Sequence, residues 1–267
     1  MVDEAEALCM AGEYASGLLL AAAAVPGLEA DPKDTRALEA RACRLVALGH
    51  QSLGHLARAT VWADRAIGLG EGLGDDRPQD LGASLHIRAI VHLERGQLRE
   101  ASGLLERAAA LLEKAGEDHR TELFAVLLTM AEVSLATGDF DAASEVFHRV
   151  LEEAGNLEPS SEEHAAALNA IVAKALLGIG GVHVERGEVA AAKDVLSRSV
   201  EFFDAAYGHN HPEMVEALTQ IAALHRLVGD EAAAEAIEEE LELAERLLLE
   251  AHLSLVPSTG EPTSSKG

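Results

Sequence analysis

The sequence predicts an all-α protein, built as a solenoid of six antiparallel helix pairs. Two observations support this fold: apolar residues recur at helical spacing, and one glycine returns at a nearly constant interval along the chain. The intervals are 42, 42, 42, 49 and 42 residues, and the glycines are Gly12, Gly54, Gly96, Gly138, Gly187 and Gly229. The exception is 42 plus one heptad, so six copies of one unit account for nearly the whole chain.

Each unit has the same residue types at the same distances from its glycine. The glycine follows an apolar helix and suits the left-handed backbone that ends it. A small residue lies seven positions before the glycine and another lies five after it, which lets two helix backbones approach closely. The preceding small residues are Ala5, Ala47, Ala89, Ala131, Gly180 and Ala222, and the following ones are Gly17, Ala59, Ala101, Ala143, Ala192 and Ala234.

This pattern resembles the tetratricopeptide repeat, with five full copies and one truncated first copy. The 42-residue period and the linker Tyr207-Gly208-His209-Asn210-His211-Pro212 are similar to the longer variant in kinesin light chains. The resemblance extends over roughly residues 1 to 245 and implies a right-handed superhelix. It also implies an interaction scaffold, because the family is defined by its architecture rather than by a reaction.

The expected domain covers residues 1–255, and a tail at 256–267 is expected to be disordered. Its units are predicted at 1–27, 33–74, 78–116, 117–155, 160–208 and 211–253.

Three local expectations concern helix ends. The second helix of the first unit should stop at Pro26-Gly27. The glycine-rich stretch 68–74 should fray or bend the end of its helix. Ser160 and Glu163 have the spacing of a capping box, so the longest leading helix should start there and run to Arg186.

Composition limits the function classes. The formal charge is −25, from 21 basic and 46 acidic residues, with no basic stretch, so nucleic acid is not expected as a partner. The N-terminus lacks a basic signal region, and no membrane span is expected. Cys9 and Cys43 are interpreted as reduced core residues, which favours a cytoplasmic protein.

Histidine is the only repeated candidate for chemistry. Four units have a histidine four residues before the glycine: His50, His92, His183 and His225. Stacked helices lie about 8–10 Å apart, whereas metal ligands bind at about 2 Å, so these histidines are predicted to be structural. A pH-sensitive seam is the alternative. No catalytic motif is found, and we expect neither enzymatic activity nor a metal or cofactor.

The resemblance also implies a concave groove, lined by positions ten, nine, six, three and two before each glycine. These positions predict a largely apolar surface that binds a partner's peptide or amphipathic helix. Gly178 and Gly181 are both expected to face it. The expected partner-binding residues are Arg44, Leu48, Gln51, His86, Ile90, Leu93, Leu128, Glu132, Leu135, Leu177, Gly181, Val184, Thr219, Gln220 and Arg226.

Alternatives to a partner in the groove are the long helix of the sixth unit, a second copy in a homodimer, or a small apolar ligand. The predicted function is therefore an adaptor or scaffold that binds another protein. The alternative is a sensor domain of a signalling or transcriptional regulator that controls an attached output domain. The truncated first unit is compatible with such a domain upstream.

Overall fold

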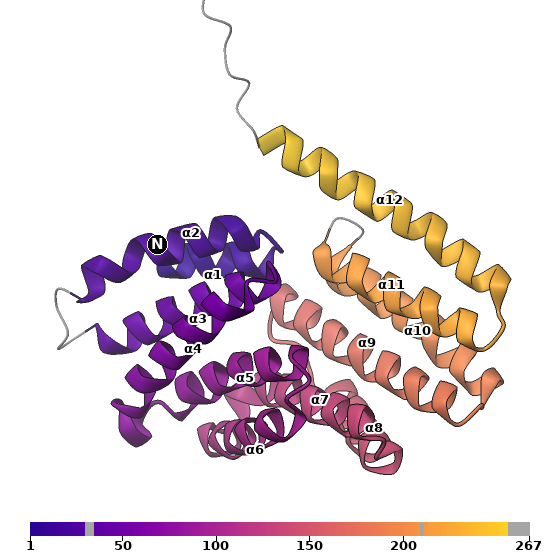
Figure 1. Ribbon diagram of the computed structural model, residues 1–267, viewed down its shortest axis with the longest axis horizontal. Coiled ribbons are helices and arrows are strands. Elements are labelled where there is room, and N and C mark those ends of the chain that lie inside the picture. The colour runs from indigo at the N-terminus through magenta and orange to yellow at the C-terminus, as the bar shows by residue number, and fades with distance from the viewer. Residues whose placement is uncertain (30–34, 209–210, 256–267) are drawn as a thin grey trace, which may run out of the picture.

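The computed structural model describes residues 1–29, 35–208 and 211–255, so the expected tail lies outside the described residues. Twelve α-helices form six antiparallel pairs, and no strand occurs among these residues (Figure 1), which confirms the all-α solenoid. Short 3-10 turns at Gly74–Asp76 and Glu117–His119 join units two to three and three to four. The helices are α1 Val2–Met10, α2 Tyr14–Glu29, α3 Arg36–Ser52, α4 Leu56–Glu71, α5 Pro78–Glu94, α6 Leu98–Ala115, α7 Arg120–Thr137, α8 Phe140–Gly155, α9 Glu162–Glu185, α10 Val189–Tyr207, α11 Pro212–Leu227 and α12 Glu231–Leu255.

The turn within each unit depends on the repeated glycine. All six glycines have a left-handed backbone, with φ between 69° and 81°. The N–H of the following residue donates to the carbonyl four residues before the glycine, as Gln97 does to His92 at 2.9 Å. This is the hydrogen bond of a Schellman motif, which satisfies a carbonyl at the helix end.

The repeated histidines belong to these turns. The ring of His92 lies 2.8 Å from Gln97 Oε1, and that of His183 lies 2.5 Å from Glu188 Oε2. In both units the partner is the residue directly after the turn glycine. The histidine side chain therefore spans the same five residues as the backbone hydrogen bond, which supports the structural interpretation.

Small residues are required where the paired helices meet. A Cβ at Gly180 would lie 2.5 Å from Leu196 Cδ2, and one at Gly17 would lie 2.5 Å from Cys9 Sγ. The alanines at the matching positions, such as Ala59 and Ala89, are fully buried. Leucine and phenylalanine side chains fill the remaining space between the helices and form the core.

Three local expectations about helix ends are wrong. Helix α2 continues through Pro26 to Glu29, because Leu28 in its last turn packs against the N-terminal core. Helix α4 stays regular through Gly68 and Gly70 and ends at Glu71. A Cβ on Gly70 would lie 3.3 Å from Leu81, so the missing side chain lets α4 approach α5.

The third difference is the start of α9. Ser161, rather than Ser160, is the N-cap, and its hydroxyl accepts the N–H of His164 at 3.1 Å. By length and composition alone, α9 could cross a membrane. More than half of its apolar stretch is buried inside the solenoid, where it packs between α8 and α10.

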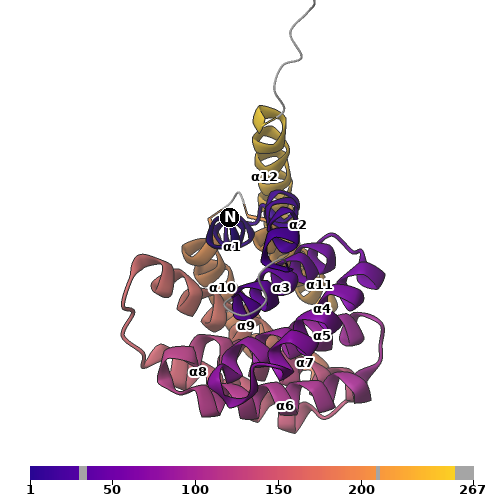
Figure 2. The ribbon, with the colours of Figure 1, turned by 90° about the vertical axis from the view of Figure 1, so that its left-hand side faces the viewer.

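The last helix, α12, packs on α11 through Ile237, Leu241 and Ala244. Its C-terminal half extends beyond the other helices in both views (Figures 1 and 2). Helix α12 therefore does not fill the inside of the curve, which excludes one of the alternatives for the groove.

The glycines of α9 differ from their expected arrangement. A Cβ at Gly178 would lie 2.3 Å from the ring of Phe147, so Gly178 faces α8 and not the inside of the curve. At Gly181 the nearest atom would be Leu135 Cδ1, at 4.0 Å. Only Gly181 therefore has room for a side chain.

This contrast predicts opposite effects of one substitution. Gly181→Ala should raise the free energy of unfolding by about 0.5–1 kcal/mol, because alanine favours a helix over glycine. Gly178→Ala should lower it by about 1–2 kcal/mol, because the methyl group overpacks against Phe147. Urea unfolding followed by circular dichroism measures both, and equal effects would contradict the assigned faces.

Candidate functional site: the concave interior

The inside of the curve is formed by the first helix of each unit. Contacts between polar side chains connect neighbouring first helices at four of the five boundaries between units, which we call seams. In three of these pairs a predicted site residue, Arg44, Gln51 or His86, contacts a residue of the neighbouring unit, and the fourth pair contains no predicted site residue. The pairs are Arg44 with Glu6 at 3.1 Å, Gln51 with Glu94 at 2.5 Å, His86 with Thr129 at 2.9 Å, and Lys174 with Glu213 at 2.8 Å.

The inner surface is more polar than the predicted apolar stripe. Leu128 is only 2% exposed and belongs to the core. The other predicted leucines are partly buried against the core clusters: Leu48, Leu93, Leu135 and Leu177. Ile90 and Val184 are also half-buried. Apolar side chains at these positions pack into the seams between units, which leaves polar groups to face the interior.

Position nine before the glycine shows this packing most clearly. Leu45 is 1% exposed, and Ile87 and Thr129 are each 6% exposed, so this position lies in the seam in units two to four. In the sixth unit the same position, Gln220, is exposed, because no further unit packs against it.

The predicted residues of unit six do not join the others. Thr219 donates to the carbonyl of Val215 in its own helix, and Gln220 reaches Glu216. Arg226 pairs with Glu238 of α12 at 2.8 Å. A partner-binding role for these residues stays a prediction, as it does for the rest of the set.

The centre of the interior is a charged cluster around Lys174 of α9. Its Nζ lies 2.8 Å from Glu213 Oε2, and Glu132 of α7 and Glu216 of α11 are close enough to interact electrostatically. Burial opposes the charge of Lys174, but Glu213 outweighs this effect and raises the pKa of Lys174, with smaller contributions from Tyr207 and Glu132, so Glu213 is its main partner. Among the residues that the structure describes, Lys174 is the one lysine or arginine that interacts electrostatically with all three carboxyls, those of Glu132, Glu213 and Glu216.

The protein raises the pKa of Glu132 and Glu216 and lowers that of Glu213. The Glu132 side chain is exposed to solvent, but it lies inside the curve of the solenoid, where the surrounding protein displaces much of the water. Desolvation therefore raises the pKa of Glu132, and it also raises the pKa of Glu216, with a further contribution from Glu213. Burial opposes ionisation of Glu213 too, but Lys174 outweighs it and lowers the pKa of that carboxyl.

Sequence reasoning missed Lys174 and Glu216, although a signal was present. Both residues lie 13 positions before their glycine. This is one helical turn before position ten, on the same face. Extending the groove positions by one turn towards the N-terminus would have found them.

His86 is a further titratable group of the interior. Its Nε2 lies 2.9 Å from Thr129 Oγ1, whose hydroxyl also donates to the carbonyl of Ala125. The histidine therefore donates and Thr129 accepts. Burial lowers the pKa of His86 to about 4, and the positive charge of Lys174 contributes to this shift.

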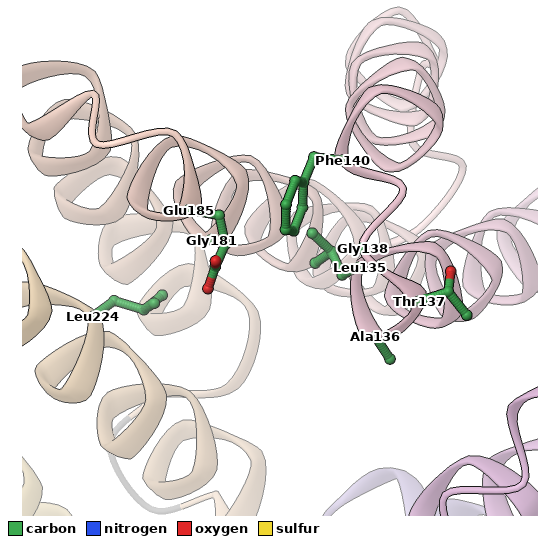
Figure 3. Close-up of a pocket in the computed structure, with 8 residues that line it drawn as sticks. All are labelled: Leu135, Ala136, Thr137, Gly138, Phe140, Gly181, Glu185 and Leu224. Carbon is green, nitrogen blue, oxygen red and sulfur yellow. The ribbon is translucent and has the colours of Figure 1, made fainter.

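A pocket of about 450 Å³ opens between the C-terminal ends of α7, α9 and α11 (Figure 3). Leu135, Phe140 and Leu224 supply its apolar wall, and Glu185 lies at its edge. Gly181 lines it and has room for a side chain. No group of three metal-ligating side chains occurs among the residues that the structure describes.

The two ends of the solenoid meet beside this interior. The turn between α1 and α2 contacts the start of α11, about 200 residues away (Figure 1). Tyr14 Oη donates to Glu213 Oε1 at 3.1 Å, and the His211 ring lies 3.2 Å from the carbonyl oxygen of Met10. Glu213 therefore links the cluster around Lys174 to the first unit.

Residues 171–246 match the sequence pattern of the tetratricopeptide repeat family. This segment carries tetratricopeptide repeats. The match covers α10 and α11 and parts of α9 and α12, and the remaining units repeat the same helix-pair fold. The predicted family resemblance is confirmed.

Solved structures of several proteins share this fold at low sequence identity. BtubC (BKLC) from P. vanneervenii has a TM-score of 0.58 at 17% identity, over 94% of this chain and 96% of its own. A kinesin light chain repeat protein of Podosopora anserina has a TM-score of 0.50 at 19% identity, over 79% of this chain and 96% of its own. These likenesses show a shared fold. No curated protein matches the chain by sequence.

A Rap protein, solved in complex with Competence and Sporulation Factor, has a TM-score of 0.68 at 15% identity. The alignment covers 92% of this chain but 62% of the Rap protein. This chain therefore spans less than two thirds of the length of that protein.

The low pKa of His86 predicts a pH dependence of stability. In the unfolded chain His86 titrates near 6.5, while in the fold it titrates at about 4. The unfolded state therefore binds the proton first, and stability is lost as pH falls from above 6.5 towards 4. Between pH 7.5 and pH 5 the loss due to His86 should be at most about 2 kcal/mol. Comparing urea unfolding of the wild type and His86→Gln at both pH values isolates it, and identical pH slopes would refute it.

Lys174 should contribute more to the free energy of unfolding than another lysine of equal exposure. Lys174→Met leaves Glu132, Glu213 and Glu216 without their cation, and should cost about 1–2 kcal/mol at pH 7 after allowance for its partial exposure. The loss should shrink at pH 4.5, where these carboxyls bind protons more readily. Lys193, which pairs with Asp230 and is 41% exposed against 40% for Lys174, is the matched control. An equal loss from Lys193→Met would argue against a special role of the cluster.

Proposed function

We propose that this tetratricopeptide-repeat solenoid is a non-catalytic scaffold that holds a peptide of a partner protein in its concave interior. The pocket around Gly181 is the observation that carries this proposal. It lies between the C-terminal ends of the first helices of units four, five and six, so an extended segment could contact all three units. Repeat solenoids commonly use such concave surfaces for binding.

The chemistry of the pocket favours an apolar side chain of the peptide. Leu135, Phe140 and Leu224 offer a wall that would desolvate such a side chain. Its volume of about 450 Å³ falls within the range of about 300–1,000 Å³ typical of ligand sites. The pocket is open to solvent, which suits a side chain attached to a longer segment better than a free small molecule.

The charges around the pocket favour a peptide with basic residues beside the apolar one. Glu185 lies at the edge of the pocket, and Glu132 lies one helical turn from Leu135 on α7. The whole chain carries a formal charge of −25. Complementary charge raises the association rate and selects against acidic segments.

The location in the cell is part of the proposal. Cys9 and Cys43 are buried thiols that form no disulfide, as expected in a reducing compartment. We place the protein in the cytoplasm on this basis.

The test fills the pocket without disturbing the fold. Peptides are selected from a displayed random library on the wild-type protein, and their affinities for Gly181→Leu and Gly181→Ala are measured by calorimetry. The leucine side chain should occupy the pocket and weaken binding at least tenfold, whereas the alanine should leave it within about twofold. Peptides that bind Gly181→Leu as tightly as the wild type would show that the pocket is not the site.

The Rap structure favours a second candidate, the sensor part of a larger regulator. The fold is shared, the relative was solved with a bound factor, and part of it has no counterpart here. In this case a peptide in the same interior would control an attached output domain. A chain whose natural reading frame encodes a further domain, with an activity that changes on peptide binding, would favour the sensor over the adaptor.

A further inference from the structure

We infer that the contact between the first and sixth units is a clasp that closes the solenoid and controls access to its interior. The clasp consists of Met10, Gly12 and Tyr14 on one side and His211, Pro212 and Glu213 on the other. Units of a solenoid normally contact only their sequence neighbours. A contact between the first and the last unit is therefore additional to the repeat architecture.

The backbone at the clasp fits without space to spare. A Cβ on Gly12 would lie 2.5 Å from Pro212 Cδ and 3.0 Å from His211 Nε2. Every other side chain would push the two ends apart. Gly12 therefore serves two purposes, because its left-handed backbone also makes the turn of the first unit.

His211 holds both sides of the clasp in one protonation state. Its Nδ1 accepts the N–H of Glu213 at 3.1 Å and so caps α11. Its Nε2 must then carry the proton, which it donates to the Met10 carbonyl at 3.2 Å. The ring is also stacked on Tyr207, with centroids 4.4 Å apart.

The clasp is small compared with the joints between neighbouring units. It relies on two hydrogen bonds and the Gly12–Pro212 contact, whereas neighbouring units share continuous buried cores. The ends can therefore separate while each unit stays folded. Opening would change the curvature of the solenoid rather than its helices.

The clasp and the interior share one residue. Glu213 accepts from Tyr14 through Oε1 and from Lys174 through Oε2. A guest that draws Lys174 towards itself alters the partner of Glu213 and hence the clasp. Only this coupling to a guest rests on the proposed function; the closure rests on the contact itself.

The test removes both hydrogen bonds and keeps the local fold. Tyr14→Phe loses the hydroxyl but retains the ring, and His211→Asn retains an N-cap but is too short to reach Met10. The matched control is Arg226→Gln, which removes an ion pair within unit six, away from the clasp. Circular dichroism confirms that the helix content is unchanged.

The first measurement is small-angle X-ray scattering. The double variant should have a larger radius of gyration and maximum dimension than the wild type and Arg226→Gln. The second measurement is access to Lys174, read by mass spectrometry after acylation with a small reagent and with the same reagent attached to a polymer. Polymer acylation of Lys174, relative to the small reagent and to exposed Lys114, should rise at least threefold in the double variant.

Either of two outcomes would overturn the inference. One is scattering of a fully helical double variant that superimposes on the wild type. The other is an opened solenoid in which the polymer reaches Lys174 no faster. If the double variant loses helix, Tyr14→Phe alone carries the test, since it deletes a single oxygen atom. Unchanged access to Lys174 in that variant would then count against the clasp. Peptide affinity is not used in this test, so its failure is distinct from failure of the proposed binding site.

Discussion

The close approach of the two helices within each unit is the constraint on which the rest of the structure depends. Alanine or glycine at both facing positions lets the backbones come together: a Cβ added to Gly180 would lie only 2.5 Å from Leu196 Cδ2. The first helices can then line the inside of the curve while the second helices form the outside. The interior, the pocket and the meeting of the two ends all follow from this repeated geometry.

The interior combines few charges with a confined space. Lys174 can remain charged because Glu213 is directly beside it, and Glu132 and Glu216 lie near enough to favour the cation. The same enclosure disfavours ionisation of Glu132 and Glu216. The inner surface therefore has an excess of carboxyl groups whose charge depends on what is bound near them.

The sequence predicted the repeated features well, because they depend on local rules. Each turn needs a glycine with a left-handed backbone, and each helix pair needs small residues at fixed distances from it. Helix ends were less predictable, since α2 and α4 continue where packing of Leu28 and the approach of Leu81 outweigh the preferences of Pro26 and Gly70.

The inner surface was harder to predict, because a helix position does not reveal what the neighbouring unit places against it. Gly178 and Gly181 are three residues apart on one helix, and only the ring of Phe147 distinguishes them. The contact of Tyr14 with Glu213 was beyond prediction for a related reason. It depends on the curvature summed over six units, and no local pattern records that sum.

The meeting of the ends has a consequence for how the array melts. A linear repeat array frays from its termini, because each terminal unit has a neighbour on one side only. Here the first unit, whose α1 has nine residues, is supported by α3 on one side and by the start of α11 on the other. The short helix α1 can therefore persist, because the start of α11 at the far end of the array packs against the first unit as a capping element would.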